Sequence, residues 1–257
     1  MRQIKVWDLP TRLFHWLLVG FVVFAWLTGE EAEEGEEGEE EAQGDAAADE
    51  LEPEEFDDEG FEDAYEGFEE SEAAPTALAD GSLDIHEIAG YVVLGLLIFR
   101  VLWGVFGGQH ARFASFLRGG RALGDYVAKL LRFAPPSLLG HNPLGGWFAM
   151  LLLGVVGAIV WTGIAASTGG EANEAVAELH AGFTNVLIAL VVVHIVGVVG
   201  DTLLTGDNLT RAMVTGTKLR PEGSAERDAR ASPLWAAVLA LAAAAAAVGY
   251  IIAAVGP

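Results

Sequence analysis

Residues 178–200 read ELHAGFTNVLIALVVVHIVGVVG, and this stretch decides the fold. It is apolar along almost its whole length, but it contains His180 and, 14 residues later, His194. About 20 apolar residues in a helix cross ~30 Å of hydrocarbon, so the stretch predicts a membrane-spanning helix. Fourteen steps of ~100° bring His194 to within ~40° of the face that carries His180, after a rise of ~21 Å. One helix face therefore offers an imidazole at each level of a membrane.

Four other stretches have a similar length and apolar character, near residues 10–28, 84–106, 143–167 and 233–256. The first lacks the small-residue cleavage site of a secretory signal, so we interpret it as a permanent helix. The fold predicted from these lengths is all-α: an integral membrane helical bundle with a four-helix core and a fifth, C-terminal transmembrane helix. No internal repeat at a fixed period is visible. The predicted segments are 1–29 (N-terminal cytoplasmic end and first helix), 30–83 (acidic periplasmic insert), 84–205 (helices two to four, with a cytoplasmic interfacial segment at 107–142), 206–232 (cytoplasmic linker) and 233–257 (fifth helix).

The net charge of -23 is concentrated in one segment. Residues 30–84 hold 26 of the 37 Asp and Glu and no Lys or Arg. Such a charge density cannot form a packed core, so we predict that the insert is disordered. Its acidic run either steers a basic periplasmic partner, such as a c-type cytochrome, or solvates an outer loop in high salt.

The basic residues predict the orientation of the chain, because Lys and Arg near membrane helices stay in the cytoplasm. All 14 lie before or at the start of the first helix, at or after the end of the second and before the third, or between the fourth and fifth. The N-terminus is therefore expected in the cytoplasm, and the segment 29–83, the loop 168–177 and the C-terminus at Pro257 are expected outside. This distribution of charge predicts a multi-pass protein of a bacterial or archaeal plasma membrane.

Four histidines lie within predicted membrane helices, where an ionisable side chain is costly and marks a functional site by default. His15 lies near the inner end of the first helix, and His86 lies near the outer start of the second. Two axial ligands of one haem iron must share a depth, so the pairs are His86 with His180 and His15 with His194. Hydrogen bonding between helices is the alternative for any single histidine, but two depth-matched pairs favour haem. Zinc fits less well because the pairs are far apart and have no third ligand, and the lack of cysteine excludes c-type haem attachment and iron–sulfur clusters.

Other residues near the depths of these histidines each have a possible functional role and a possible structural role. Arg12 and Arg100 lie at the inner level and either bind haem propionates or anchor the helices at the interface. His110 and His141 either line a quinone or proton site or serve loop structure and helix capping. A glycine lies within five residues of each intramembrane histidine and leaves room for a macrocycle or for close helix packing. These are Gly20, Gly90, Gly182 and Gly197.

Four motifs carry a resemblance to a known family. VWDLPTRLFHW at 6–16, RVLWG at 100–104, ARF at 111–113 and GHNPLGG at 140–146 resemble the bacterial cytochrome b561 and nickel-hydrogenase cytochrome b family, over residues 1 to about 205. The resemblance implies a four-helix core with two b haems, ligated from helices one, two and four. It implies that His15, His86, His180 and His194 are the ligands, and that electrons pass between a periplasmic redox partner and membrane quinone.

The predicted function is that of a di-haem b-type cytochrome, working as the electron-transfer subunit of a respiratory oxidoreductase in the plasma membrane. Its expected partners are lipid, quinone and a periplasmic c-type cytochrome or hydrogenase-like complex, and no nucleic acid. One alternative is a self-contained membrane oxidoreductase that acts on superoxide or a ferric chelate with quinone. The other is a haem-free membrane anchor of a periplasmic complex. Reaction of the isolated chain with superoxide or a ferric chelate would favour the self-contained oxidoreductase. A colourless purified protein would favour the haem-free anchor.

Overall fold

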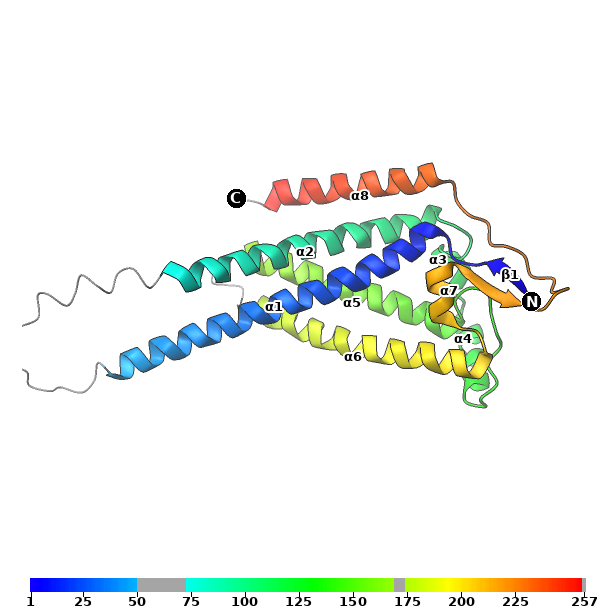
Figure 1. Ribbon diagram of the computed structural model, residues 1–257, viewed down its shortest axis with the longest axis horizontal. Helices are drawn as coiled ribbons and strands as arrows, with labels where there is room; N and C mark the ends of the chain where they lie inside the picture. The colour runs from blue at the N-terminus through cyan, green and yellow to red at the C-terminus, as the bar shows by residue number, and fades with distance from the viewer. Residues whose placement is uncertain (50–72, 169–173, 256–257) are drawn as a thin grey trace, which may run out of the picture. The chain divides into compact units, whose positions relative to one another are not determined.

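The computed structural model describes residues 1–49, 73–168 and 174–255, which are almost entirely helical (Figure 1). One two-stranded sheet accompanies the helices. The elements in chain order are β1 (Arg2–Lys5), α1 (Leu9–Asp49), α2 (Ala73–Phe106), α3 (Phe113–Phe116), α4 (Gly120–Leu130), α5 (Pro143–Thr168), α6 (Glu174–Thr205), α7 (Leu209–Thr215), β2 (Thr217–Arg220) and α8 (Leu234–Val255).

Five helices are long and apolar enough to cross a membrane, which confirms the predicted helical membrane bundle. Most of their apolar side chains are exposed in the isolated chain, as expected for surfaces that contact lipid. The spans agree with the predicted ones to within a few residues. They are Leu9–Gly29, Ile85–Phe106, Pro143–Thr168, Glu174–Thr205 and Leu234–Ala254.

Helix α1 continues to Asp49, well past its apolar span, and α2 begins at Ala73. Within the segment 30–83, for which we predicted disorder, the structure therefore has helix over residues 30–49 and 73–83. Glu and Ala both favour helix, which explains how a segment with no core can still be helical next to a membrane span. Residues 50–72 lie outside the described residues, so disorder there stays a prediction.

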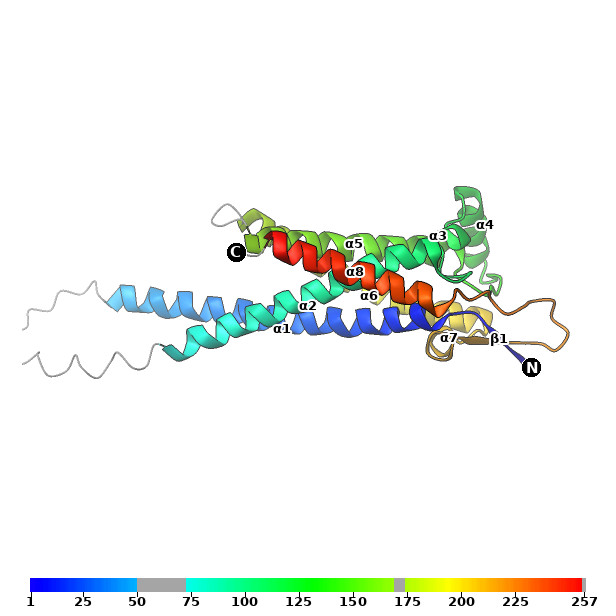
Figure 2. The ribbon, with the colours of Figure 1, turned by 90° about the horizontal axis from the view of Figure 1, so that it is seen from above.

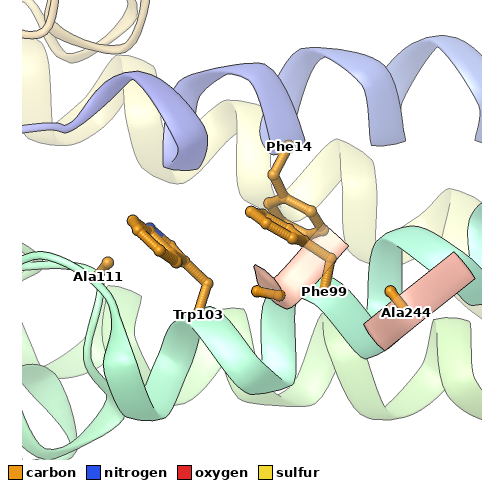
Figure 3. Close-up of a cluster of buried hydrophobic side chains, with 6 residues drawn as sticks. Phe14, Phe99, Trp103, Ala111 and Ala244 are labelled. Carbon is orange, nitrogen blue, oxygen red and sulfur yellow. The ribbon is translucent and has the colours of Figure 1, made fainter. Parts of the chain in front are cut away.

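The chain divides into two compact units, Met1–Gly20 with Tyr91–Pro257, and Phe21–Gly90. In the larger unit, α5 packs along α6. A buried cluster joins the start of α1, the end of α2 and α8, with Phe14 beside Phe99 and Trp103, and Ala244 beneath them (Figure 3). The rings of Phe99 and Trp103 stack at 5.9 Å between centroids. This cluster fixes the first turns of α1, on which His15 lies.

Short elements cap the larger unit at the end where α5 begins and α6 ends, which we call the inner end (Figure 1). Strands β1 and β2 pair antiparallel, with Arg2 opposite Arg220. Sequence patterns missed this sheet because each strand is four residues long and its partner is more than 200 residues away. The predicted interfacial segment contains α3 and α4, and α4 lies across the direction of α5 (Figure 2).

A buried ionic network holds the cap together. The carboxylate of Asp207 accepts hydrogen bonds from Arg220 at 2.6 Å and from Lys218 at 3.2 Å. Burial alone would raise the pKa of Asp207, but the hydrogen bonds from Arg220 and Ser137 and the charge of Lys218 together lower it below its ordinary value. The carboxylate is therefore ionised at neutral pH, and the network ties β2 to the end of α6.

Candidate functional site

At the inner end, Asp8 sets the start of α1. Its carboxylate accepts the backbone N–H of Thr11 at 3.0 Å, a normal helix cap, and also the indole N–H of Trp103 and the N–H of Gly108. Asn142 caps α5 in the same way, accepting the N–H of Gly145 at 2.6 Å. These caps fix the depth at which the first helical turns present their side chains.

His15 of α1 and His194 of α6 both lie in the larger unit. The ring of His194 lies parallel to that of Phe148, with an interplanar angle of 8° and centroids 6.2 Å apart. Both imidazoles are half-buried. The pairing of His15 with His194 as ligands of one haem stays a prediction.

Several buried polar atoms of the larger unit have no hydrogen-bond partner within the described ranges 1–49, 73–168 and 174–255. They are Thr11 Oγ1, Arg12 Nε, His15 Nδ1, Arg100 Nη1 and His141 Nδ1. Buried polar groups are normally satisfied, so such a concentration indicates a ligand site. Two are guanidinium donors, which suit a carboxylate, and two are imidazole nitrogens, which can bind a metal ion or form a hydrogen bond.

Arg100 lies inside the span of α2 and is only 5% exposed. Its guanidinium lies 4.7 Å from the ring centre of Phe113 and 5.9 Å from that of Phe14. These cation–π contacts hold the side chain but leave N–H groups able to bind an anion. Arg12 donates a hydrogen bond to the carbonyl oxygen of Val214 in the cap, and the propionate role of Arg12 and Arg100 stays a prediction.

In the unit Phe21–Gly90, His86 of α2 is held by α1. Its Nδ1 lies 2.8 Å from the carbonyl oxygen of Ala25 and 3.5 Å from the hydroxyl of Thr28. A side chain at Gly29 would place its Cβ 3.1 Å from Cε1 of the ring. The glycine therefore permits the ring to approach α1.

At the other end of α6, His180 is held by α5. Its Nδ1 lies 2.9 Å from the carbonyl oxygen of Ile159 and 3.2 Å from the hydroxyl of Thr162. A Cβ at Gly163 would lie 3.0 Å from the ring. The pairing of His86 with His180 stays a prediction.

The four glycines near the histidines border open space. A Cβ added at any one of them would meet no other atom within 4 Å among the residues that the structure describes. They are Gly20, Gly90, Gly182 and Gly197. A macrocycle in this space stays a prediction.

His110 and His141 lie in the cap. The ring of His141 is enclosed by Phe116 and Trp7, at 4.6 and 4.8 Å between centroids, and burial, followed by the repulsion of Arg100, lowers its pKa to about 3. Burial, followed by the charge of Lys218, also lowers the pKa of His110. Both imidazoles are therefore neutral at physiological pH. A cavity of about 210 Å³ lies beside them, and Ser115 and Arg118 contribute polar groups to its lining.

Sequence reasoning located the histidines and arginines but missed the groups that hold them. Asp8 was visible only as part of a motif, and Phe148 as one apolar residue among many. The Thr-Gly pairs at 28–29 and 162–163 could have been found from the sequence, because the same dipeptide recurs near the outer end of two spans. Nothing in the sequence alone connected either pair with a histidine on the following helix.

Comparison with known proteins agrees with this arrangement. The family model for prokaryotic cytochrome b561 matches residues 6–216, a range that includes all six histidines and the first four spans. No curated protein and no solved structure matches the chain. Since the matched range covers most of the chain and includes the first four membrane helices, the chain belongs to the prokaryotic cytochrome b561 family of membrane b-type cytochromes, which bind haem and transfer electrons.

Proposed function

We propose that the chain binds two b haems, each between two histidines, and transfers electrons across the plasma membrane between a periplasmic redox partner and the quinone pool. One observation carries the proposal: His15 Nδ1, Arg12 Nε and Arg100 Nη1 are buried without a hydrogen-bond partner among the described residues, in the unit that also holds His194. An imidazole pair for the iron and cations for the propionates are what a b haem requires of a protein.

The residues have distinct roles in this proposal. His15 and His194 are the axial ligands at the inner level, with Arg12 and Arg100 as propionate donors. His86 and His180 are the ligands at the outer level, a pairing that rests on their equal depth in the predicted helices. When bound, haem b supplies a one-electron carrier whose iron changes oxidation state while its axial ligands stay in place.

The protein supplies orientation, charge and exclusion of water. The Phe14, Phe99 and Trp103 cluster holds the first turns of α1 and the end of α2 in a water-poor setting. The positive charge of Arg100, retained at low exposure, favours the reduced, more negatively charged state of a neighbouring group. The ring of Phe148 restrains the plane of His194. These contacts keep the ligand geometry unchanged between oxidation states, which makes electron transfer fast.

The orientation is part of the proposal. All 14 Lys and Arg belong to the larger unit, and those after α2 and α6 lie in the loops of its inner end. By the positive-inside rule this end faces the cytoplasm, and Pro257 lies on the periplasmic side. The acidic segment 30–83 then extends into the periplasm, where its charge attracts a basic redox partner.

The cavity beside His110 and His141 supports quinone exchange at the cytoplasmic side. It lies in the same unit as the His15 and His194 pair, and its polar groups suit the carbonyl oxygens of a quinone head group. Neutral imidazoles can donate a hydrogen bond to such an oxygen without introducing a buried charge.

The test is a reduced-minus-oxidised spectrum of the detergent-purified chain with haem counted per chain. We expect two b haems in the parent and one in each of His86→Ala and His194→Ala, with different haems lost. His110→Ala serves as the matched control and should retain both. A colourless parent, or both haems retained in the ligand variants, would contradict the proposal. Oxidation of superoxide or reduction of ferric chelates by the isolated chain would favour the self-contained enzyme instead.

A further inference from the structure

The two outer histidines have the same surroundings, although they lie in different helix pairs. In each case Nδ1 points at a helix carbonyl, with a threonine hydroxyl three residues further on and a glycine directly after it. On α1 the sequence is Ala25-Trp26-Leu27-Thr28-Gly29, and on α5 it is Ile159-Val160-Trp161-Thr162-Gly163. Because the same arrangement occurs twice, we infer that it has a common role and did not arise independently from the packing of each helix pair.

The correspondence extends along both helix pairs. With Thr28 aligned on Thr162, Gly20 falls on Gly154, Phe14 on Phe148, and the cap Asp8 on the cap Asn142. With His86 aligned on His180, Arg100 falls on His194. The α1–α2 and α5–α6 pairs are thus two versions of one unit. The outer histidine is common to both, and the inner positions have diverged.

The hydrogen bonds fix the tautomer of each outer ring. A carbonyl oxygen can only accept, so Nδ1 of His86 and of His180 must carry the proton and the lone pair lies on Nε2. Nε2 is therefore the atom that binds a metal ion. A hydrogen bond from Nδ1–H also makes an imidazole a stronger electron donor to the metal.

Each threonine adds a second acceptor to the same proton. The hydroxyl of Thr28 donates to the carbonyls of Phe24 or Ala25 at 3.1 Å, and that of Thr162 donates to those of Ala158 or Ile159 at 2.9 and 3.0 Å. Its proton is thereby committed to the helix, and its lone pairs can face the imidazole N–H. The following glycine lets the ring come close enough, because a Cβ would lie 3.0 to 3.1 Å from it.

We propose that Thr28-Gly29 and Thr162-Gly163 are positioning residues for His86 and His180, and that they set the redox potential of the outer haem. The proposal deepens the proposed function and rests on it. The threonine hydroxyls strengthen electron donation from the histidines and so stabilise the ferric state, while the glycines define the distance between ring and helix.

The experiment measures the potentials of both haems and the low-spin ferric electron paramagnetic resonance spectrum in Thr28→Val and Thr162→Val. Valine keeps the shape but removes the acceptor, so we expect the outer haem to shift to a higher potential with haem content unchanged. The inner haem should keep its potential. Thr28→Ser and Thr162→Ser should restore the parent values.

Two controls separate this role from general effects on packing. Thr184→Val removes a hydroxyl that donates to the carbonyl of His180 on its own helix at 3.0 Å and should leave the potential unchanged. Gly29→Ala and Gly163→Ala should lower outer-haem content, whereas Gly249→Ala on α8, where a Cβ meets open space, should not.

The outcomes distinguish the two proposals. A parent that lacks the outer haem refutes the proposed function and the positioning role with it. A parent with two haems whose Thr→Val variants keep both potentials and both spectra refutes only the positioning role.

Discussion

The outer and inner histidines are held in opposite ways. His86 and His180 each hydrogen-bond to a carbonyl of the preceding helix, with a threonine and a glycine beside the ring. His15, in contrast, has a buried Nδ1 with no hydrogen-bond partner in the described part of the chain, and Arg12 Nε and Arg100 Nη1 also lack one there. The rings of His86 and His180 are thus oriented by the protein itself, whereas the proposed inner site is completed by the group that we propose binds there.

Haem depletion gives the largest expected difference between the two ends. Because a ligand stabilises the state that binds it, by about 4 kcal/mol at a thousandfold excess over Kd, we expect the haem-free chain to lose much of its thermal stability. The loss of stability should be larger at the inner end than at the outer end. Hydrogen exchange should accelerate more in residues 9–20 than in 25–29, with α8 as reference. Equal acceleration at both places would remove the contrast.

Asp207→Asn tests whether the inner site depends on the cap. Removing one partner of a buried ionic network costs about 3 kcal/mol, so we expect lower thermal stability and weaker retention of the inner haem only. The pKa of Asp207 is lowered, so its stabilisation is full above the ordinary value of 3.8 and is lost as the pH falls through the lower, folded-state pKa. Acid titration of the parent should show this loss, and Asp207→Asn should lack it. Retention of both haems to the same extent would contradict the dependence.

Asp8→Ala should have a smaller effect, about 2 kcal/mol, because the N–H groups of Thr11, Trp103 and Gly108 lose their shared acceptor. We expect a lower melting temperature and a weaker inner haem. Asp125→Ala, on the exposed side of α4, is the control. An unchanged melting temperature would show that the cap of α1 is dispensable.

Phe148→Leu should have the smallest effect. Loss of the parallel ring beside His194 removes about 1 kcal/mol, roughly a fivefold change in affinity for the inner haem. The measurement is haem retention during dilution, with Phe106→Leu on the exposed surface of α2 as the control. Weaker retention of the outer haem in place of the inner one would contradict the assignment of His194 to the inner haem.

The internal correspondence of the helix pairs shows why one feature escaped the sequence patterns. Thr28 and Thr162 are 134 residues apart, but His86 and His180 are 94 apart, because the acidic segment lengthens the first connection. A search at one fixed period therefore misses both alignments. The insert also explains why helix at 30–49 and 73–83 was not expected, since its charge masks the helix preference of Glu and Ala.

The sequence by itself determined the five spans, the depths of the four intramembrane histidines and the side on which positive charge gathers. These follow from hydropathy and from the 1.5 Å rise and 3.6-residue turn of a helix, which are local properties. The tertiary structure alone decided which carbonyl faces each outer ring, that Arg12 Nε and Arg100 Nη1 are buried without a hydrogen-bond partner in the described residues, and that β1 pairs with β2 across the whole chain. Such contacts depend on which helix lies next to which, and that is fixed by packing between segments distant in sequence.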